Sequence, residues 1–240
     1  MRARGGFDPK IEVNFDQKDF KGTTYYDKLN AAFKIPTWYG LELKGTFEQN
    51  EGTFLNPENN VPDDGLYSAG ISFALGQGFW INERMATLKQ AKLFREQSKA
   101  DRDLLINQIL YNASLAYFDL DGDIDVAFEI MGMPLDSFSI EKHPKLKSLN
   151  YKIEGLEVDK RYKANKLLPK IDLEYNFITE TPELVNSLET QNYKGGINFQ
   201  LPLFLRKERG DLKLAKFKLQ GAQYELDNTQ IELKNKIVAI

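Results

Sequence analysis

Residues 169–177 read PKIDLEYNF, and in this stretch the apolar side chains fall on every second position from Ile171 to Phe177. A period of two residues is typical of a β-strand with one apolar face. Residues 9–15, PKIEVNF, carry the same kinds of side chain in the same order. The sequence therefore predicts that one short strand occurs twice in a chain of 240 residues.

The repeat continues beyond these two strands. YSAGISFAL at 67–75 resembles YKGGINFQL at 193–201, and a turn and a helix start follow in both copies. The matching helix positions are Leu88 with Leu212 and Ala91 with Ala215. The duplicated unit is therefore strand, loop, strand, turn and long helix, and repeated units normally bury a shared surface side by side.

Three long helices are predicted. From Asn82 to Asp119 there is no proline or glycine and good helix formers dominate, which predicts one helix about 57 Å long. A second helix is predicted to begin at Pro144 and to end before Pro169, and a third covers residues 206–240. The first helix has a thin apolar stripe, which favours a coiled coil or a helical barrel over a single solvated helix. The stripe consists of Met85, Leu88, Ala91, Leu105, Ile109, Tyr111 and Ala116.

Composition excludes several classes of protein. The formal net charge is −3 and no basic cluster occurs, so nucleic acid is not expected as a partner. The absence of cysteine excludes disulfides and thiolate catalysis. The longest apolar runs, such as LPLFL at 201–205, are far shorter than the ~20 residues that a membrane-spanning helix needs. A transmembrane β-barrel is compatible with this composition, because alternating strands hardly register in a hydropathy average.

Reactive side chains do not form a recognisable active site. His143 is the one histidine, and a lone imidazole beside Pro144 at a helix start is more often structural than a metal ligand. Gly76-Gln77-Gly78 has neither a GxGxxG pattern nor a following Lys-Ser/Thr, so it is interpreted as a strand-to-helix turn. We therefore expect no catalytic, cofactor-binding or metal-binding residue, no cofactor and no enzymatic activity.

An acidic run and a set of aromatic residues have two interpretations each. DLDGDID starts at Asp119 and alternates aspartates as a calcium loop does, but its glycine is at the fourth position and Ile130 at the twelfth, so a solvated acidic turn is favoured over an EF-hand. Its acids are Asp119, Asp121, Asp123 and Asp125. Several aromatics near the predicted strand ends are interpreted as the interfacial girdle of a barrel, with core aromatics as the alternative. They are Tyr25, Tyr26, Trp38, Tyr39, Phe79 and Trp80.

Four stretches together resemble the TolC-like outer-membrane efflux proteins. They are GGFDPKIEV at 5–13, GLYSAGISFALGQGFWINERMATLKQAKLF at 65–94, HPKLKSLNYKIEGLEVDKRYKANKLLPKIDLEYNF at 143–177, and YKGGINFQLPLFLRKERGDLKLAKFKLQGAQYEL at 193–226. The last is the most specific, because it has the family's double glycine, apolar-Pro-apolar-Phe step and Leu/Ala helix start. The positions are Tyr193, Gly195, Gly196, Leu201, Pro202, Leu203, Phe204, Leu212 and Ala215.

The resemblance implies an α+β fold in which duplicated β-hairpins form part of a transmembrane β-barrel, joined to long α-helices of a coiled-coil helical barrel. In the family, three identical chains give four strands each to one shared twelve-stranded barrel in the Gram-negative outer membrane. The helices lie in the periplasm and meet a periplasmic adaptor and an inner-membrane pump. The implied function is a passive conduit for exported small molecules in an efflux or secretion system, with outer-membrane lipid around it.

The expected organisation follows the chain in six segments. They are a first hairpin region with a long extracellular excursion (1–80), a long periplasmic helix (81–120), a shortened linker (121–143), an ascending helix (144–168), a second hairpin (169–205) and a descending helix (206–240). The excursion, Asp16 to Leu66, is predicted to form an extended hairpin or extra strands. Because no helix precedes Pro9 and the linker is short for the family, we expect a fragment or an internally deleted form.

A different class of protein has to be weighed against the channel. A non-transporting structural or assembly protein could be built from the same hairpins and coiled helices, because several predicted strands are interrupted by Lys or Asp. An enzyme is the least favoured class, since no set of acid, base or metal ligands emerges.

Overall fold

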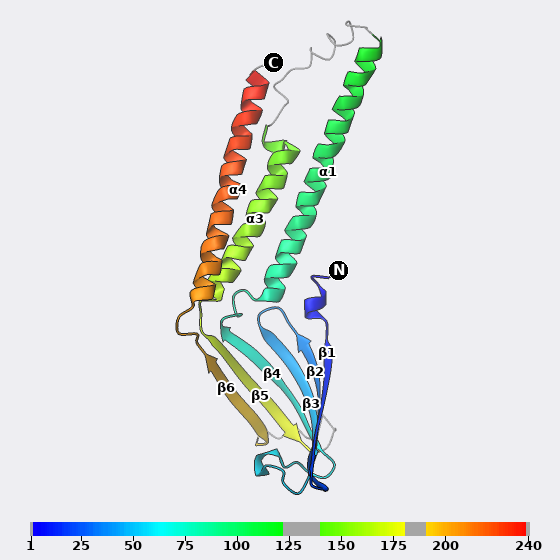
Figure 1. Cartoon of the computed structure of the whole chain (residues 1–240), viewed down its shortest axis with the longest axis vertical. Coiled ribbons are helices and arrows are strands. Elements are labelled where there is room, and N and C mark those ends of the chain that lie inside the picture. The colour runs from blue at the N-terminus through cyan, green and yellow to red at the C-terminus, as the bar shows by residue number, and fades with distance from the viewer. Residues whose placement is uncertain (1, 122–139, 181–190, 239–240) are drawn as a thin grey trace. The chain divides into compact units, whose positions relative to one another are not determined.

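The computed structural model describes residues 2–121, 140–180 and 191–238 (Figure 1). The chain forms two compact units. The first combines Met1–Thr87 with Ala164–Glu208, and the second combines Leu88–Lys163 with Arg209–Ile240. The first unit contains every described strand, and the second is helical.

The first unit is a single antiparallel sheet of six strands, whose order in space is their order in the chain (Figure 1). The strands are β1 (Lys10–Phe20), β2 (Thr23–Pro36), β3 (Leu41–Glu51), β4 (Leu66–Gly76), β5 (Lys170–Thr179) and β6 (Tyr193–Gln200). Three short 3-10 turns accompany the main elements, η1 (Gly5–Phe7), η2 (Pro57–Asn59) and η4 (Ile140–Lys142). Because β1 and β6 do not pair with each other, the sheet is open and does not close into a barrel within one chain.

The predicted first hairpin is corrected by the strand order. The strand that begins PKIEVNF pairs with β2, where Ile11 lies opposite Phe33, and two strands separate it from β4. The cause is a tight turn at Lys21-Gly22, whose two residues have φ angles of 52° and 74°. Positive φ at both residues of a two-residue loop is the geometry that closes a β-hairpin. The strand that begins PKIDLEY pairs with β6, so that Phe177 lies opposite Tyr193.

The excursion between the two matching strands of the first copy contains β2 and β3. These strands have 14 and 11 residues and pair with each other from Asp27–Glu51 to Pro36–Glu42. The first copy of the repeat is therefore a four-stranded meander, whereas the second copy has two strands. The sequence predicted either an extended hairpin or extra strands for this excursion. The structure shows two extra strands within the sheet.

Three long helices are described: α1 (Glu83–Asp121), α3 (Pro144–Asn165) and α4 (Arg206–Val238). Asn82 is not the first residue of α1 but its cap, because its Oδ1 accepts a hydrogen bond from the Met85 N–H at 2.9 Å. No described helix has both the length and the apolar character to cross a membrane.

The second unit buries a narrow seam of small and aliphatic side chains. In α4 the buried residues are Ala215, Leu219, Ala222 and Thr229, at spacings of four, three and seven, which fit the heptad repeat of a coiled-coil seam. The stripe predicted on α1 is only partly buried within a single chain. Met85 is 2% exposed, but Leu105, Ile109 and Tyr111 are more than half exposed.

Candidate functional site

The sheet has one apolar face that extends across all six strands. Alternation along each strand and the register between strands place the odd-numbered residues on this face. One row across the sheet consists of Ile11, Phe33, Gly45, Ala69, Phe177 and Tyr193. A second row consists of Val13, Ala31, Phe47 and Tyr67. Because every strand keeps the same parity, apart from the last two residues of β1 beyond a bulge at Lys18, the apolar side chains form a continuous band.

This apolar face is exposed. Ile11 is 76% exposed, Ile197 is 77% exposed and Phe199 is 62% exposed. In a water-soluble protein, a sheet face of this composition normally packs against another layer. A contiguous exposed apolar surface instead marks a site of contact with a protein or a membrane.

The opposite face is polar and charged, and several of its ions are paired. Lys34 Nζ lies 2.5 Å from Glu12 Oε2 between neighbouring strands. Lys44 of β3 reaches over β4 to hydrogen-bond Glu174 of β5. Lys194 of β6 lies 3.9 Å from Glu48 of β3, and two strands, β4 and β5, lie between β6 and β3. Side chains of strands that are not adjacent meet on this face, so the sheet curves toward its polar side.

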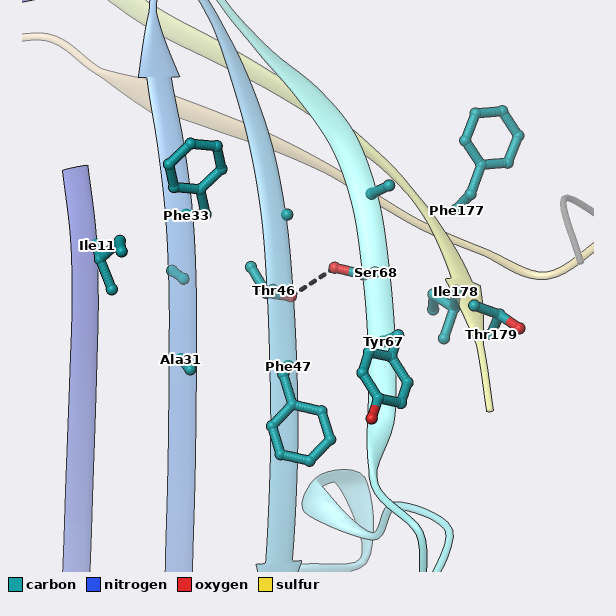
Figure 2. Close-up of a pocket in the computed structure, with 13 residues that line it drawn as sticks. Ile11, Ala31, Phe33, Thr46, Phe47, Tyr67, Ser68, Phe177, Ile178 and Thr179 are labelled. Atoms are coloured by element: carbon teal, nitrogen blue, oxygen red, sulfur yellow. Dashed lines mark hydrogen bonds between the residues drawn. The ribbon is translucent and has the colours of Figure 1, made fainter. Parts of the chain in front are cut away.

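An apolar hollow lies in the middle of the sheet. Its volume is about 550 Å³, and its lining comes from β1, β2, β3, β4 and β5. Figure 2 shows the rings of Phe33, Phe47, Tyr67 and Phe177 around it. The hydroxyls of Thr46 and Ser68 are 2.5 Å apart and satisfy each other. Among these lining residues there is no carboxylate, imidazole or amine, so the hollow offers surface and not acid–base chemistry.

Aromatic side chains gather at the two ends of the sheet. Near the tip of the β1–β2 hairpin, the ring of Tyr25 lies 6.1 Å from Phe20 and 4.6 Å from Phe54. At the other end, Trp38 stacks on Phe7 at 5.2 Å. There Phe79 and Trp80 also pack edge to face at 4.9 Å. The six aromatics singled out from the sequence thus lie at or next to strand ends. Three further aromatics at these ends were missed, namely Phe7 before β1, Phe20 at the end of β1 and Phe54 after β3.

The turn predicted at residues 76–78 joins β4 to α1. Gly76 and Gly78 have φ angles of 73° and 99°. The Gln77 N–H donates to the Pro169 carbonyl at 2.9 Å, and the Gly78 N–H donates to Asn165 Oδ1 at 2.8 Å. The turn uses its amides for contacts with the end of α3 and the start of β5, so its glycines are structural.

His143 begins α3. Its carbonyl accepts a hydrogen bond from the Lys147 N–H, and its Nδ1 accepts one from the Lys145 N–H at 3.2 Å. Partial burial, together with the charges of Lys145 and Lys236, holds the pKa of His143 below its ordinary value. The neutral imidazole is therefore favoured, which suits an acceptor at a helix N-terminus.

The acidic run is only partly described. Asp119 lies in the last turn of α1, whereas Asp123 and Asp125 lie outside the described residues. Within the described parts of the chain, no three His, Asp or Glu side chains are grouped so that they could hold a metal ion.

Comparisons with known proteins give structural likeness at low sequence identity. No protein-family model matches the chain, and no curated protein matches it. A membrane protein from Pseudomonas aeruginosa is 13% identical, with a TM-score of 0.41, over 98% of this chain and 66% of that chain. The CmeC outer-membrane channel of Campylobacter jejuni is 12% identical, with a TM-score of 0.39, over 98% of this chain and 62% of that chain. The outer-membrane protein VceC of Vibrio cholerae is 12% identical, with a TM-score of 0.40, over 99% of this chain and 70% of that chain.

The chain spans less than two thirds of the length of the first two of these proteins. CmeC is described as an outer-membrane channel and VceC as an outer-membrane protein.

Proposed function

We propose that the chain is a subunit of an outer-membrane channel in a multicomponent efflux or secretion system, and that the channel is a passive conduit for exported small molecules. The observation that carries the proposal is the division of one six-stranded sheet into an exposed apolar face and a charged face. In a transmembrane β-barrel the apolar face contacts lipid and the polar face lines the lumen.

The dimensions of the strands support this assignment. A tilted strand needs about 9–11 residues to cross the hydrocarbon core. β1, β3 and β4 have 11 residues each, and β5 has 10. The aromatics at the two sheet ends fit the girdles at the two membrane interfaces.

Closure of the barrel requires other copies. An open sheet in lipid would leave the backbone N–H and C=O groups of β1 and β6 without partners, which costs several kcal/mol for each group. Identical copies can supply the missing partners, and we propose a homotrimer in the outer membrane. The helices would form a coiled-coil helical barrel in the periplasm and meet a periplasmic adaptor and an inner-membrane pump. The seam of buried side chains on α4 supports the coiled-coil packing of the helices.

The role of the chain in transport would be physical and not catalytic. Exported molecules would pass along the charged face, where paired side chains such as Lys44 and Glu174 keep the wall polar without a large net charge. The energy for export would come from the pump.

Two neighbouring substitutions test which face contacts lipid. Ile71 and Ser72 are consecutive in β4, so their side chains point to opposite faces, and Ser72 lies opposite Glu42 and Glu174. We expect Ile71→Lys to reduce the amount of heat-sensitive trimer in the outer-membrane fraction, because a lysine on the lipid face costs about 2–4 kcal/mol near the midplane. Ser72→Lys would be tolerated, since it adds a cation beside two carboxylates.

The same preparations decide between the channel and the structural alternative. The unsubstituted chain should conduct ions in a planar bilayer. A soluble, non-conducting product in which Ile71→Lys and Ser72→Lys are both harmless would refute the channel and favour a non-transporting assembly protein. In that case Ile71, which is 46% exposed, would simply face water.

A further inference from the structure

We propose that β6 of one copy pairs with β1 of the next copy in a single register, which places Lys194 opposite Asp16 of the next copy and Gln200 opposite Lys10 of the next copy. The inference rests on the proposed channel and specifies how its copies join. It also gives the barrel six strands per copy, in contrast to the four that the family resemblance implies.

The two edges of the sheet are long and open. β1 has 11 residues and β6 has 8, and every residue of both strands is exposed. An edge strand presents a row of unpaired N–H and C=O groups, which is a template for another strand. Because all neighbours in the sheet are antiparallel, the first and sixth strands run in opposite directions. Copies related by rotation therefore bring β6 antiparallel to β1, and repetition of this head-to-tail contact can close a ring.

The two faces restrict the register to alternate positions. Ile197 and Phe199 lie on the apolar face of β6, and Ile11 and Val13 lie on the apolar face of β1. A shift of one residue would turn one strand's apolar side chains into the lumen. Odd-numbered residues must therefore lie opposite odd-numbered residues.

The stagger of the sheet itself selects one of the remaining registers. The row that starts at Lys10 ends at Lys194, six positions before Gln200; it runs through Lys34, Lys44, Gly70 and Asn176. Each strand is therefore displaced along its axis relative to the one before it, and the displacement adds up to six residues from β1 to β6. Pairing Gln200 with Lys10 of the next copy continues this step and keeps the strand ends level around a ring.

The resulting stagger agrees with the geometry of closed barrels. Six positions over six strands is one residue per strand, and with about 3.3 Å per residue and about 4.8 Å between strands the tilt is about 35°. Strands in closed barrels tilt by about 35–45°. The register is therefore one that a closed barrel can adopt.

Charge complementarity favours the same register. It puts the ammonium of Lys194 opposite the carboxylate of Asp16 of the next copy. Lys194 is 70% exposed, and its contact with Glu48 at 3.9 Å leaves its other N–H groups available. A register two residues away puts Lys194 opposite either Lys18 or Asn14, and like charges directly opposite are unfavourable. With three copies, the barrel would have 18 strands, a size that leaves an aqueous channel.

Paired cysteines test the register in the full chain, which has no cysteine of its own. Asn14 and Gly196 lie opposite each other in the proposed register, and a Cβ at Gly196 meets no atom within 4 Å. We expect the Asn14→Cys/Gly196→Cys chain in outer membranes to form disulfide-linked dimers and trimers on mild oxidation. The control, Asn14→Cys/Asn198→Cys, is displaced by two residues and should form at least several-fold fewer.

The outcomes separate this inference from the proposed function. Conducting membranes with no cross-link, or with more cross-link in the control, would overturn the register and leave the channel intact. Cross-links in the expected pair of a non-conducting product would support the edge pairing and refute the channel. A charge exchange provides a second measurement. Asp16→Lys should lower the fraction of heat-sensitive oligomer, and adding Lys194→Asp should restore it; failure of this rescue would contradict the proposed ion pair.

Discussion

On the polar face, β4 lies between two strands, β3 and β5, that are joined by an ion pair, and a small residue of β4 lies under this pair. Lys44 must pass over β4 to reach Glu174, and the residue opposite Lys44 is Gly70. A Cβ at Gly70 would lie 2.1 Å from Asn176 Oδ1 and 2.2 Å from the Tyr175 carbonyl oxygen. The glycine therefore allows β4 and β5, which come from the two copies of the repeat, to pair closely.

Gly70→Ala should weaken this junction. The methyl group has no room, and overpacking of this kind typically costs about 1–3 kcal/mol. We expect a lower temperature for the loss of the folded oligomer, measured by heating before electrophoresis. Gly155→Ala is the matched control, because a Cβ there meets no atom within 4 Å and alanine favours helix. An equal effect of both substitutions would contradict the close packing at Gly70.

At the scale of elements, helix starts and seams are fixed by a few contacts. The α3 helix is preceded by a histidine whose neutral ring accepts a backbone hydrogen bond from the first turn. The α4 helix presents a seam of small side chains together with Leu219, which is 7% exposed. Ion pairs accompany these helices, with Lys152 Nζ 2.7 Å from Glu225 Oε2 and Lys163 Nζ 3.2 Å from Asp211 Oδ2.

His143 should make the stability of the helical unit depend on pH. Its pKa in the folded chain is lowered by burial and by Lys145 and Lys236, so the unfolded chain binds the proton more readily. The contribution of the neutral His143 to the free energy of unfolding is complete above the ordinary histidine pKa of about 6.5. It is lost as the pH falls through the lowered pKa of the folded chain. Thermal unfolding monitored by helical circular dichroism should show this loss as a lower unfolding temperature at low pH. The substitution His143→Gln should make the unfolding temperature depend less on pH. A slope unchanged by the substitution would assign the pH dependence to other groups.

Two identical truncations on α4 test the seam. Leu219 is buried and Leu214 is 54% exposed. Leu219→Ala should lower the free energy of unfolding by about 2–5 kcal/mol, as for other buried leucines. Leu214→Ala should change it by no more than about 0.5 kcal/mol, as is usual for surface positions. Denaturant unfolding of both variants measures the difference, and similar values for the two would show that the seam is not a packed interface.

For the whole molecule, the charged face is expected to set the ion preference of the lumen. Lys44 lies on this face with Glu174, and Glu42 of the same strand also lies on it, 3.6 Å from Arg84. Lys44→Glu would replace a cation by a third carboxylate and leave Glu174 without its partner. We expect the reversal potential in a salt gradient to shift toward cation selectivity, with Lys44→Gln intermediate. An unchanged reversal potential would mean that this face does not line the conducting path.

The sequence by itself determined the faces of the strands and the extents of the helices. Period-two alternation places Ile171, Leu173 and Tyr175 on one face whatever their neighbours are, because the pleat alone decides the direction of each side chain. Runs without proline or glycine likewise predict α1, and Pro169 predicts the end of α3. These are local properties of the backbone, so a single sequence is enough to read them.

Only the tertiary structure decided which strands are neighbours. The pairing of β1 with β2, the four strands of the first copy, and the ion pair of Lys44 with Glu174 depend on contacts between distant parts of the chain. The repeated sequence predicted one hairpin region in each copy, the first with a long excursion of open form, and the positive φ angles at Lys21-Gly22 turn the chain back at once, so that the excursion supplies two strands. The tertiary structure also decided which positions of α1 are buried, because burial depends on which helix faces a residue and not on the apolar stripe alone. Strand partners and helix partners are choices among many alternatives of similar local energy, and the packing of the whole chain selects among them.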